Sequence, residues 1–124
     1  MSLPNRMDRI AGMIQKELGE LIDQRLQNPK IPPFVTVHSV KVAKDLSNAE
    51  VRVTFLQDET PEAIEEIIGE LQKAARFLRS ELSHRIRLKY MPELRFHYNP
   101  STHYAAELEK IFKKIEPETR PADG

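Results

Sequence analysis

One long apolar repeat between residues 61 and 88 constrains the fold more than any other feature of the chain. Thr60 and Pro61 form a helix start, with a hydroxyl that can cap the first turn and a proline at the first helical position. The apolar residues that follow recur every three or four positions and are Ile64, Ile67, Ile68, Leu71, Ala75, Leu78, Leu82 and Ile86. This spacing predicts more than six turns of helix with one buried face, and Gly69 or Ala74-Ala75 could bend it. Because strand patterns flank it, we interpret it as the core helix of a mixed domain.

The same stretch changes the sign of its charge along its length. Residues 61–70 carry four Glu and no Lys or Arg, whereas residues 73–97 hold seven basic and two acidic side chains, a net charge of +5. The formal net charge of the whole chain is zero. A concentrated basic surface is what an RNA phosphate backbone binds, and the planar fork of arginine suits phosphate oxygens. The RNA-contact residues that we predict from this cluster are Lys73, Arg76, Arg79, Arg85, Arg87 and Lys89.

The segment before residue 60 predicts a helix followed by a β-hairpin. From Asn5 to Leu26 the apolar residues keep the spacing of one buried helical stripe, and a proline-rich segment then ends the helix. Two strand patterns follow at residues 34–43 and 49–55, separated by a polar turn. The apolar phase of the first strand slips between Val37 and Val40, which indicates a β-bulge or a strand buried on both faces. This helix and hairpin add four basic residues to the predicted RNA-contact set, Arg6, Arg9, Lys41 and Lys44.

The segment after residue 90 predicts a last strand at residues 91–98, a short helix at residues 104–115 and a disordered tail at residues 117–124. The order is helix, strand, strand, helix, helix, strand, helix, with the long repeat counted as two helices. It predicts one α+β domain over residues 1–116, with a three-stranded sheet covered by helices on one face. The first two strands are expected to be antiparallel, and the long helical crossover allows the final strand to lie parallel to one of them.

Residue types that usually carry catalysis or metal binding are scarce or poorly spaced. The chain has no Cys, which excludes disulfides, thiolate metal sites and thiol nucleophiles. Its four His show no ligand spacing, and its four Gly form no phosphate-binding loop. No apolar run approaches the roughly 20 residues of a membrane span, and the start of the chain lacks a signal-peptide core. We therefore expect a cytoplasmic monomer that is not an enzyme and that uses no cofactor or metal.

The basic cluster and the apolar repeat each allow a second interpretation. Basic residues on an outward helix face are often only a solvated surface. The apolar repeat has heptad-like spacing, so the alternative function is a dimerising protein-interaction module that uses the helix at residues 61–88 as its interface. Phe77, at the flank of this helix, is expected to pack in the core. RNA binding would then rest on phosphates and shape more than on base identity.

Several short segments, in their order and spacing, resemble the bacterial ribosome-binding factor A family. These segments are residues 8–18, 28–30, 35–37, 44–49, 74–79 and 92–96. The resemblance covers about residues 6–115 and implies a K-homology-like fold of the bacterial type, with the order α-β-β-α-α-β. It also implies a non-catalytic factor that binds the small (30S) ribosomal subunit during late assembly and helps to mature and process its rRNA. Other assembly factors or GTPases stay open as further partners.

The resemblance also points to a site between the two helices of the long repeat. Members of the family replace the glycine-rich RNA-clamping loop of K-homology domains by an Ala-x-Gly kink between the helices. The matching residues here are Ala74, Ala75 and Arg76, so the glycine is absent. Because arginine does not adopt a positive φ cheaply, we expect the helix to run through Arg76 with ordinary helical angles. Arg76 also places an additional positive charge at the expected RNA-facing position.

Overall fold

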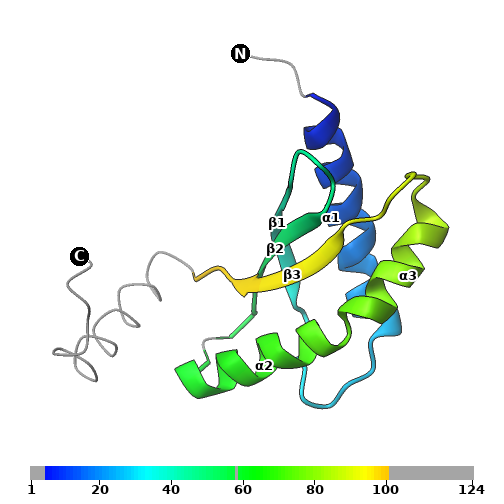
Figure 1. Cartoon of the computed structure of the whole chain (residues 1–124). Coiled ribbons are helices and arrows are strands. Elements are labelled where there is room, and N and C mark those ends of the chain that lie inside the picture. The colour runs from blue at the N-terminus through cyan, green and yellow to red at the C-terminus, as the bar shows by residue number, and fades with distance from the viewer. Residues whose placement is uncertain (1–4, 58, 101–124) are drawn as a thin grey trace, which may run out of the picture.

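The part of the chain that the structure describes, residues 5–57 and 59–100 of a computed structural model, folds into three helices and three strands. In chain order these are α1 (Arg6–Arg25), β1 (Thr36–Val42), β2 (Asn48–Thr54), α2 (Pro61–Lys73), α3 (Ala75–Arg85) and β3 (Glu93–Tyr98) (Figure 1). The order is α-β-β-α-α-β, which confirms the predicted α+β class. The helix expected at residues 104–115 and the tail expected at residues 117–124 lie outside the described residues.

α1 and α2 begin at residues whose side chains cap the first turn. The Asn5 side chain accepts a hydrogen bond of 2.8 Å from the Asp8 N–H, and the Asp8 carboxylate accepts one of 3.3 Å from the Asn5 N–H. Thr60 Oγ1 accepts a hydrogen bond of 3.1 Å from the Ala63 N–H, and Pro61 occupies the first helical position. These contacts satisfy backbone donors that a helix start otherwise leaves unpaired.

The sheet has the strand order β1-β2-β3, with β2 in the centre. β1 and β2 pair antiparallel, and their register shifts between Val37 and Ser39, so the β-bulge is the correct one of the two explanations for the slipped apolar phase. β2 and β3 pair parallel, with Val51 opposite Phe96. The two helices between β2 and β3 supply the crossover that a parallel pair requires.

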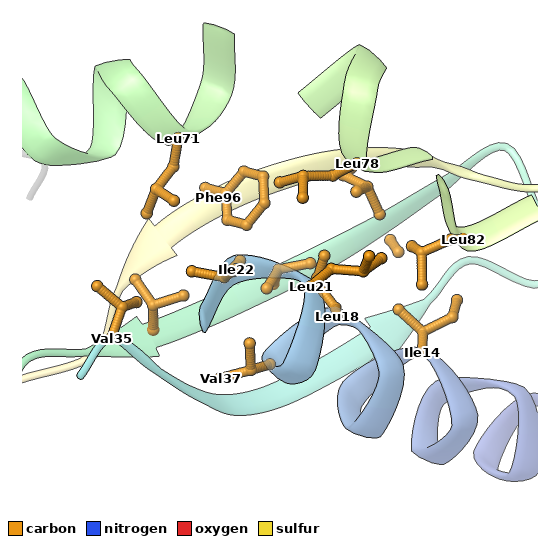
Figure 2. Close-up of a cluster of buried hydrophobic side chains, with 14 of the residues drawn as sticks. Ile14, Leu18, Leu21, Ile22, Val35, Val37, Leu71, Leu78, Leu82 and Phe96 are labelled. Atoms are coloured by element: carbon orange, nitrogen blue, oxygen red, sulfur yellow. The ribbon is translucent and has the colours of Figure 1, made fainter. Parts of the chain in front are cut away.

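The hydrophobic core lies between one face of the sheet and the three helices. Buried residues of β2 alternate with polar ones, so that Val51 and Val53 face the helices while Arg52 lies on the open face. Figure 2 shows how Leu71 of α2 and Leu78 of α3 approach Phe96 of β3. On the α1 side the residues drawn in the core are Ile14, Leu18, Leu21 and Ile22, all nearly inaccessible to solvent.

The long repeat forms two helices, as the predicted element order had it, because α2 ends at Lys73 and α3 begins at Ala75. An unbroken helix of 26 residues would be roughly 39 Å long, whereas a six-residue strand such as β3 spans only roughly 20 Å. The break folds both halves of the apolar face onto the same core. α3 ends at Arg85, so Arg87 and Lys89 lie in the loop that leads to β3 and not on the helix.

The structure gives no support to the alternative of a dimerising helix. The apolar positions Ile67, Leu71, Leu78 and Leu82, which would form its interface, are buried in the core of the domain. They are therefore unavailable to a second copy without unfolding. Within residues 5–57 and 59–100, no helix combines the length and the apolar character that crossing a membrane requires.

Candidate nucleic-acid interface

The junction between α2 and α3 bends without any residue of unusual backbone conformation. Ala74 has φ −85° and ψ −1°, which lies in the right-handed region. Its N–H lies 3.2 Å from the Glu70 carbonyl and 3.1 Å from the Leu71 carbonyl, and its own carbonyl accepts a 2.9 Å hydrogen bond from Leu78. Backbone hydrogen bonding therefore continues from one helix into the next. The bend is made with Ala74, Ala75 and Arg76 and without glycine.

Arg76 itself lies in the first turn of α3 and has helical geometry, as we expected for this residue. Among the non-glycine residues that the structure describes, positive φ values occur only at Phe34 (62°) and Leu46 (63°). Arginine at position 76 is therefore unstrained. Its side chain is exposed, and within the described part of the chain it forms no ion pair.

A groove of about 360 Å³ lies between this junction and the start of β3. Its basic side chains come from the helices and are Lys73, Arg76 and Arg79. Glu93 and Leu94 of β3 form the opposite wall. A second hollow of about 260 Å³, lined by Arg76, Arg79, Ser80, Ser83 and Met91, continues along α3. The structure thus brings three of the predicted RNA-contact residues together on one surface.

Arg79 joins the groove to the loop after α3. Its Nε donates a 2.8 Å hydrogen bond to the Met91 carbonyl, which orients the guanidinium and ties the loop to the helix. The terminal nitrogens of the guanidinium are not used by this bond and keep their donors for a ligand. Because an arginine held in one orientation loses less conformational freedom on binding, this contact favours recognition of an anion such as phosphate.

Lys73 is held partly in place by Glu70 on the same helix. Lys73 Nζ lies 3.2 Å from Glu70 Oε2, yet the lysine side chain remains 76% exposed. Glu70 also accepts a 2.9 Å hydrogen bond from the Asn28 side chain. The Asn28 hydrogen bond, and secondly the Lys73 hydrogen bond, lower the pKa of Glu70, because both stabilise its ionised form. The contact between Asn28 and Glu70 connects the loop after α1 to the end of α2.

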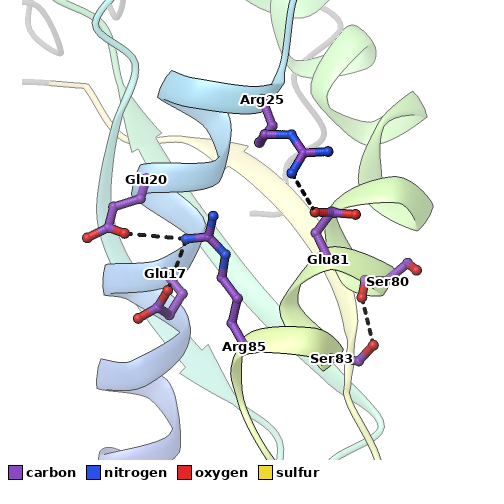
Figure 3. Close-up of polar contacts among 7 residues, drawn as sticks. All are labelled: Glu17, Glu20, Arg25, Ser80, Glu81, Ser83 and Arg85. Atoms are coloured by element: carbon purple, nitrogen blue, oxygen red, sulfur yellow. Dashed lines mark hydrogen bonds and ion pairs between the residues drawn. The ribbon is translucent and has the colours of Figure 1, made fainter.

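Arg85, at the other end of α3, is engaged by carboxylates of α1. Its Nη1 lies 3.1 Å from a Glu17 oxygen and 3.3 Å from a Glu20 oxygen (Figure 3). Arg25 of α1 likewise pairs with Glu81 of α3 at 3.2 Å (Figure 3). These ion pairs hold the two helices side by side. The structure therefore places Arg85 away from the groove and in the interface between α1 and α3.

The remaining predicted RNA-contact residues are spread over four other parts of the molecule. Arg87 and Lys89 are exposed in the loop after α3, where Lys89 Nζ lies 5.6 Å from the ring centroid of Tyr90. Arg6 and Arg9 are exposed at the start of α1. Lys44 lies in the turn between β1 and β2.

Lys41 is on the open face of the sheet, on the opposite side from the helices. In the register of β1 and β2 it lies opposite Glu50, whose carboxylate contacts Arg95 and His97. Lys41 therefore lies apart from the groove, whose lining does not include it.

Sequence reasoning misjudged one aromatic residue and missed one amide. Phe77, which we expected in the core, is 41% exposed on α3, because Leu78 occupies the buried position of that turn. Gln72 donates from Nε2 to the Leu94 carbonyl at 2.9 Å and accepts at Oε1 from the Phe96 N–H at 3.0 Å. A glutamine at an exposed helix position carries no sequence signal for such a contact with a strand more than 20 positions away.

The order α-β-β-α-α-β, with a sheet ordered β1-β2-β3 and a parallel third strand, defines a K-homology-like domain of the bacterial type. Comparison with known proteins agrees with the resemblance inferred from the sequence. The sequence model of the family described as Ribosome-binding factor A matches residues 6–112. Ribosome-binding factor A of Hahella chejuensis is 46% identical over 114 residues, which cover 89% of this chain and 84% of that protein.

Two structures extend this similarity to three dimensions. The crystal structure of ribosome-binding factor A from Thermus thermophilus has a TM-score of 0.64 at 28% identity, covering 76% of this chain and 97% of that chain. Coordinates of the Thermus thermophilus factor fitted into the cryo-EM map of its complex with the 30S subunit have a TM-score of 0.57 at 29% identity, covering 73% and 94%. The chain belongs to the ribosome-binding factor A family.

Proposed function

We propose that this protein binds the immature small (30S) ribosomal subunit and assists the late maturation and processing of its rRNA. The proposal rests on membership of the ribosome-binding factor A family and on the 30S complex of a family member with the same fold. In this proposal the protein acts in the cytoplasm as a monomer and has no enzymatic activity. Its effect on maturation comes from binding alone.

The observation that carries the proposal is the convergence of Lys73, Arg76 and Arg79 on one groove. Side-chain cations that lie together without enough carboxylates to balance them attract the phosphates of single-stranded or irregular RNA. Arg87 and Lys89, in the loop that Arg79 ties to α3, extend the basic surface beyond the groove. We propose these five side chains as the principal rRNA contacts. Arg6, Arg9 and Lys44 stay predicted secondary contacts.

Sedimentation of cell extracts through a sucrose gradient tests the proposed partner. The protein is expected to travel with free small subunits and to be absent from intact ribosomes and from free large subunits. Equal distribution over all ribosomal particles would contradict it, because a basic surface without a preferred partner binds any exposed rRNA. A matched run at high salt shows whether the association is electrostatic.

The salt dependence of binding to purified small subunits tests the proposed contacts. If four to six side chains neutralise phosphates, the logarithm of the association constant falls with the logarithm of salt concentration at a slope of about −3 to −5. A slope near zero would show that cations do not carry the binding. We further propose that residues 1–116 are the binding domain, so a chain shortened after residue 116 keeps the affinity of the full chain.

A further inference from the structure

The outer edge of β3 forms hydrogen bonds with the Gln72 side chain, at a point where a further strand or a ligand could otherwise bind. β3 is an edge strand, because the sheet order is β1-β2-β3. The Leu94 carbonyl and the Phe96 N–H, two residues apart, are the outward acceptor and donor of such an edge. The Gln72 side chain bonds both, at 2.9 Å and 3.0 Å. One amide thus replaces one unit of a missing neighbouring strand.

The hydrogen-bonding pattern of this amide is also the pattern of a nucleobase edge. Glutamine offers a donor N–H and an acceptor C=O side by side. The Watson–Crick edges of adenine, cytosine and uracil offer a neighbouring donor and acceptor as well, and single-stranded RNA is read through these edges. A strand edge with one free carbonyl and one free N–H can therefore bond a base as it bonds Gln72.

The distribution of charge around the groove fits a base at this point. The cations Lys73, Arg76 and Arg79 all come from the helical wall, whereas the wall formed by β3 carries the carboxylate of Glu93. A nucleotide in the groove would place its phosphate against the helices and its base against the strand, since a phosphate is repelled by the carboxylate. The base would then meet the Leu94 carbonyl and the Phe96 N–H, which Gln72 already occupies.

We propose that Gln72 stands in for a nucleobase, so that the groove binds RNA through its phosphates and does not read base identity. This inference rests on the proposed function, because it assumes that the groove binds RNA. It assigns Gln72 as a specificity-determining residue that makes binding tolerant of sequence. The glutamine is exposed and lines the groove, so its removal opens the strand edge to a ligand.

The test uses two variants of Gln72 that both lose the amide but differ in how much space the new side chain fills beside β3. Gln72→Ala removes the amide and opens the edge, whereas Gln72→Met removes the same two hydrogen bonds but keeps the space filled. Both residues favour helices and the position is exposed, so we expect both variants to fold. Fluorescence anisotropy measures their affinity for ten-nucleotide RNAs made only of A, only of C or only of U. Gln72→Ser serves as a second small variant and is expected to behave as Gln72→Ala does.

The parent chain and Gln72→Met are expected to bind the three RNAs with affinities that agree within about twofold. Gln72→Ala is expected to prefer one of them by about tenfold, the discrimination that one well-formed pair of hydrogen bonds to a base edge provides. Uniform binding by both small variants would overturn the proposal, because the free edge would then not read a base. A base preference in the parent that Gln72→Ala loses would also overturn it, since Gln72 would then read the base itself.

Sedimentation with purified small subunits separates this inference from the proposed function. If the parent sediments with small subunits and Gln72→Ala gains no base preference, the role of Gln72 is wrong and the proposed function stands. If Gln72→Ala gains a base preference while the parent fails to sediment with small subunits, the role of Gln72 holds and the proposed partner is wrong. Circular dichroism of all variants confirms that the comparison is made on folded protein.

Discussion

Two arginines at opposite ends of α3 show how the same residue type serves two purposes. Arg85, in the last turn, lies 3.1 Å and 3.3 Å from two carboxylates of α1, and its side chain keeps only 29% of its exposure. Arg76, in the first turn, is exposed in the groove and, within the residues that the structure describes, pairs with no carboxylate. Arg85 forms ion pairs between two helices, whereas the charge of Arg76 is available to a ligand.

The difference lies in what the rest of the fold brings to each position. Glu17 is 68 positions away from Arg85 in the sequence, so no local count of charge reveals that it neutralises the arginine. At the α2–α3 junction the nearest carboxylates are Glu70, already bonded to Asn28 and Lys73, and Glu93 on the far wall. A basic run in a sequence therefore marks a region, and tertiary packing decides which of its charges face a ligand.

Reversing the free charges should give the largest effect. Arg76→Glu combined with Arg87→Glu is expected to weaken binding to small subunits by roughly 100-fold, about tenfold for each reversed charge. The matched control is Lys41→Glu combined with Arg52→Glu, on the open face of the sheet, which should change affinity by less than about threefold. Equal losses in the two double variants would remove the special role of the α2–α3 junction.

Removing the engaged arginine should change stability and leave binding intact. Arg85→Ala is expected to lower the free energy of unfolding by about 1 kcal/mol. Solvent screens the two partly exposed ion pairs, so they contribute only part of this value, and the lost packing of the arginine stem contributes the rest. Urea unfolding gives the stability, and affinity for small subunits should stay within about twofold. Arg87→Ala, just beyond the helix, should show the opposite pattern of weaker binding and unchanged stability.

Two substitutions at Arg76 separate the effect of backbone flexibility on stability from the effect of charge on binding. Arg76→Gly is expected to be roughly 0.5–1 kcal/mol less stable than Arg76→Ala, because residue 76 has helical geometry and glycine loses more backbone freedom there. Both variants lose the same charge, so their affinities for small subunits should fall equally. Thermal or urea unfolding of the pair measures the backbone contribution. A glycine variant more stable than the alanine variant would mean that the junction is strained at this residue.

The smallest effect concerns the carboxylate beside the groove. The Asn28 and Lys73 hydrogen bonds lower the pKa of Glu70 below its ordinary value of 4.5, so its ionised form stabilises the fold above that pH. This contribution should be lost as the pH falls through the folded-state pKa of Glu70. In Glu70→Gln, whose amide oxygen can still accept from Asn28, this pH dependence should be absent. The free energy of unfolding is measured for both proteins between pH 3 and 7. If it depends on pH in the same way in the parent and in Glu70→Gln, the lowered pKa of Glu70 is contradicted.

The fold could be predicted well because its information is local. The helical stripe of α1, the alternation in β2 and the caps at Asn5 and Thr60 are each visible within a few residues. The slipped apolar phase of β1 indicated an irregularity there, and a β-bulge was one of its two explanations. The break at Ala74 was expected only from the resemblance to a known family, because the residues around it favour a helix and carry no local signal for a break.

The candidate site could be predicted only as a region. Lys73, Arg76 and Arg79 belong to the predicted RNA-contact set, and they line one groove in the structure. Arg87 was expected within a helix at residues 61–88, but α3 ends at Arg85. The contact of Gln72 with β3 depends on a strand paired in a distant part of the chain, and no property of glutamine indicates it.

The parallel pairing of β3 with β2 has a consequence for the order in which the molecule acquires its parts. β1 and β2 are joined by a short turn and can pair early, but β3 reaches β2 only after both intervening helices have been made. Contacts between such distant segments form slowly and late in folding. The groove has β3 as one wall, so it exists only in the finished molecule. A nascent chain carries the basic helices before it carries the groove, and we expect recognition of the ribosome to begin with the last strand.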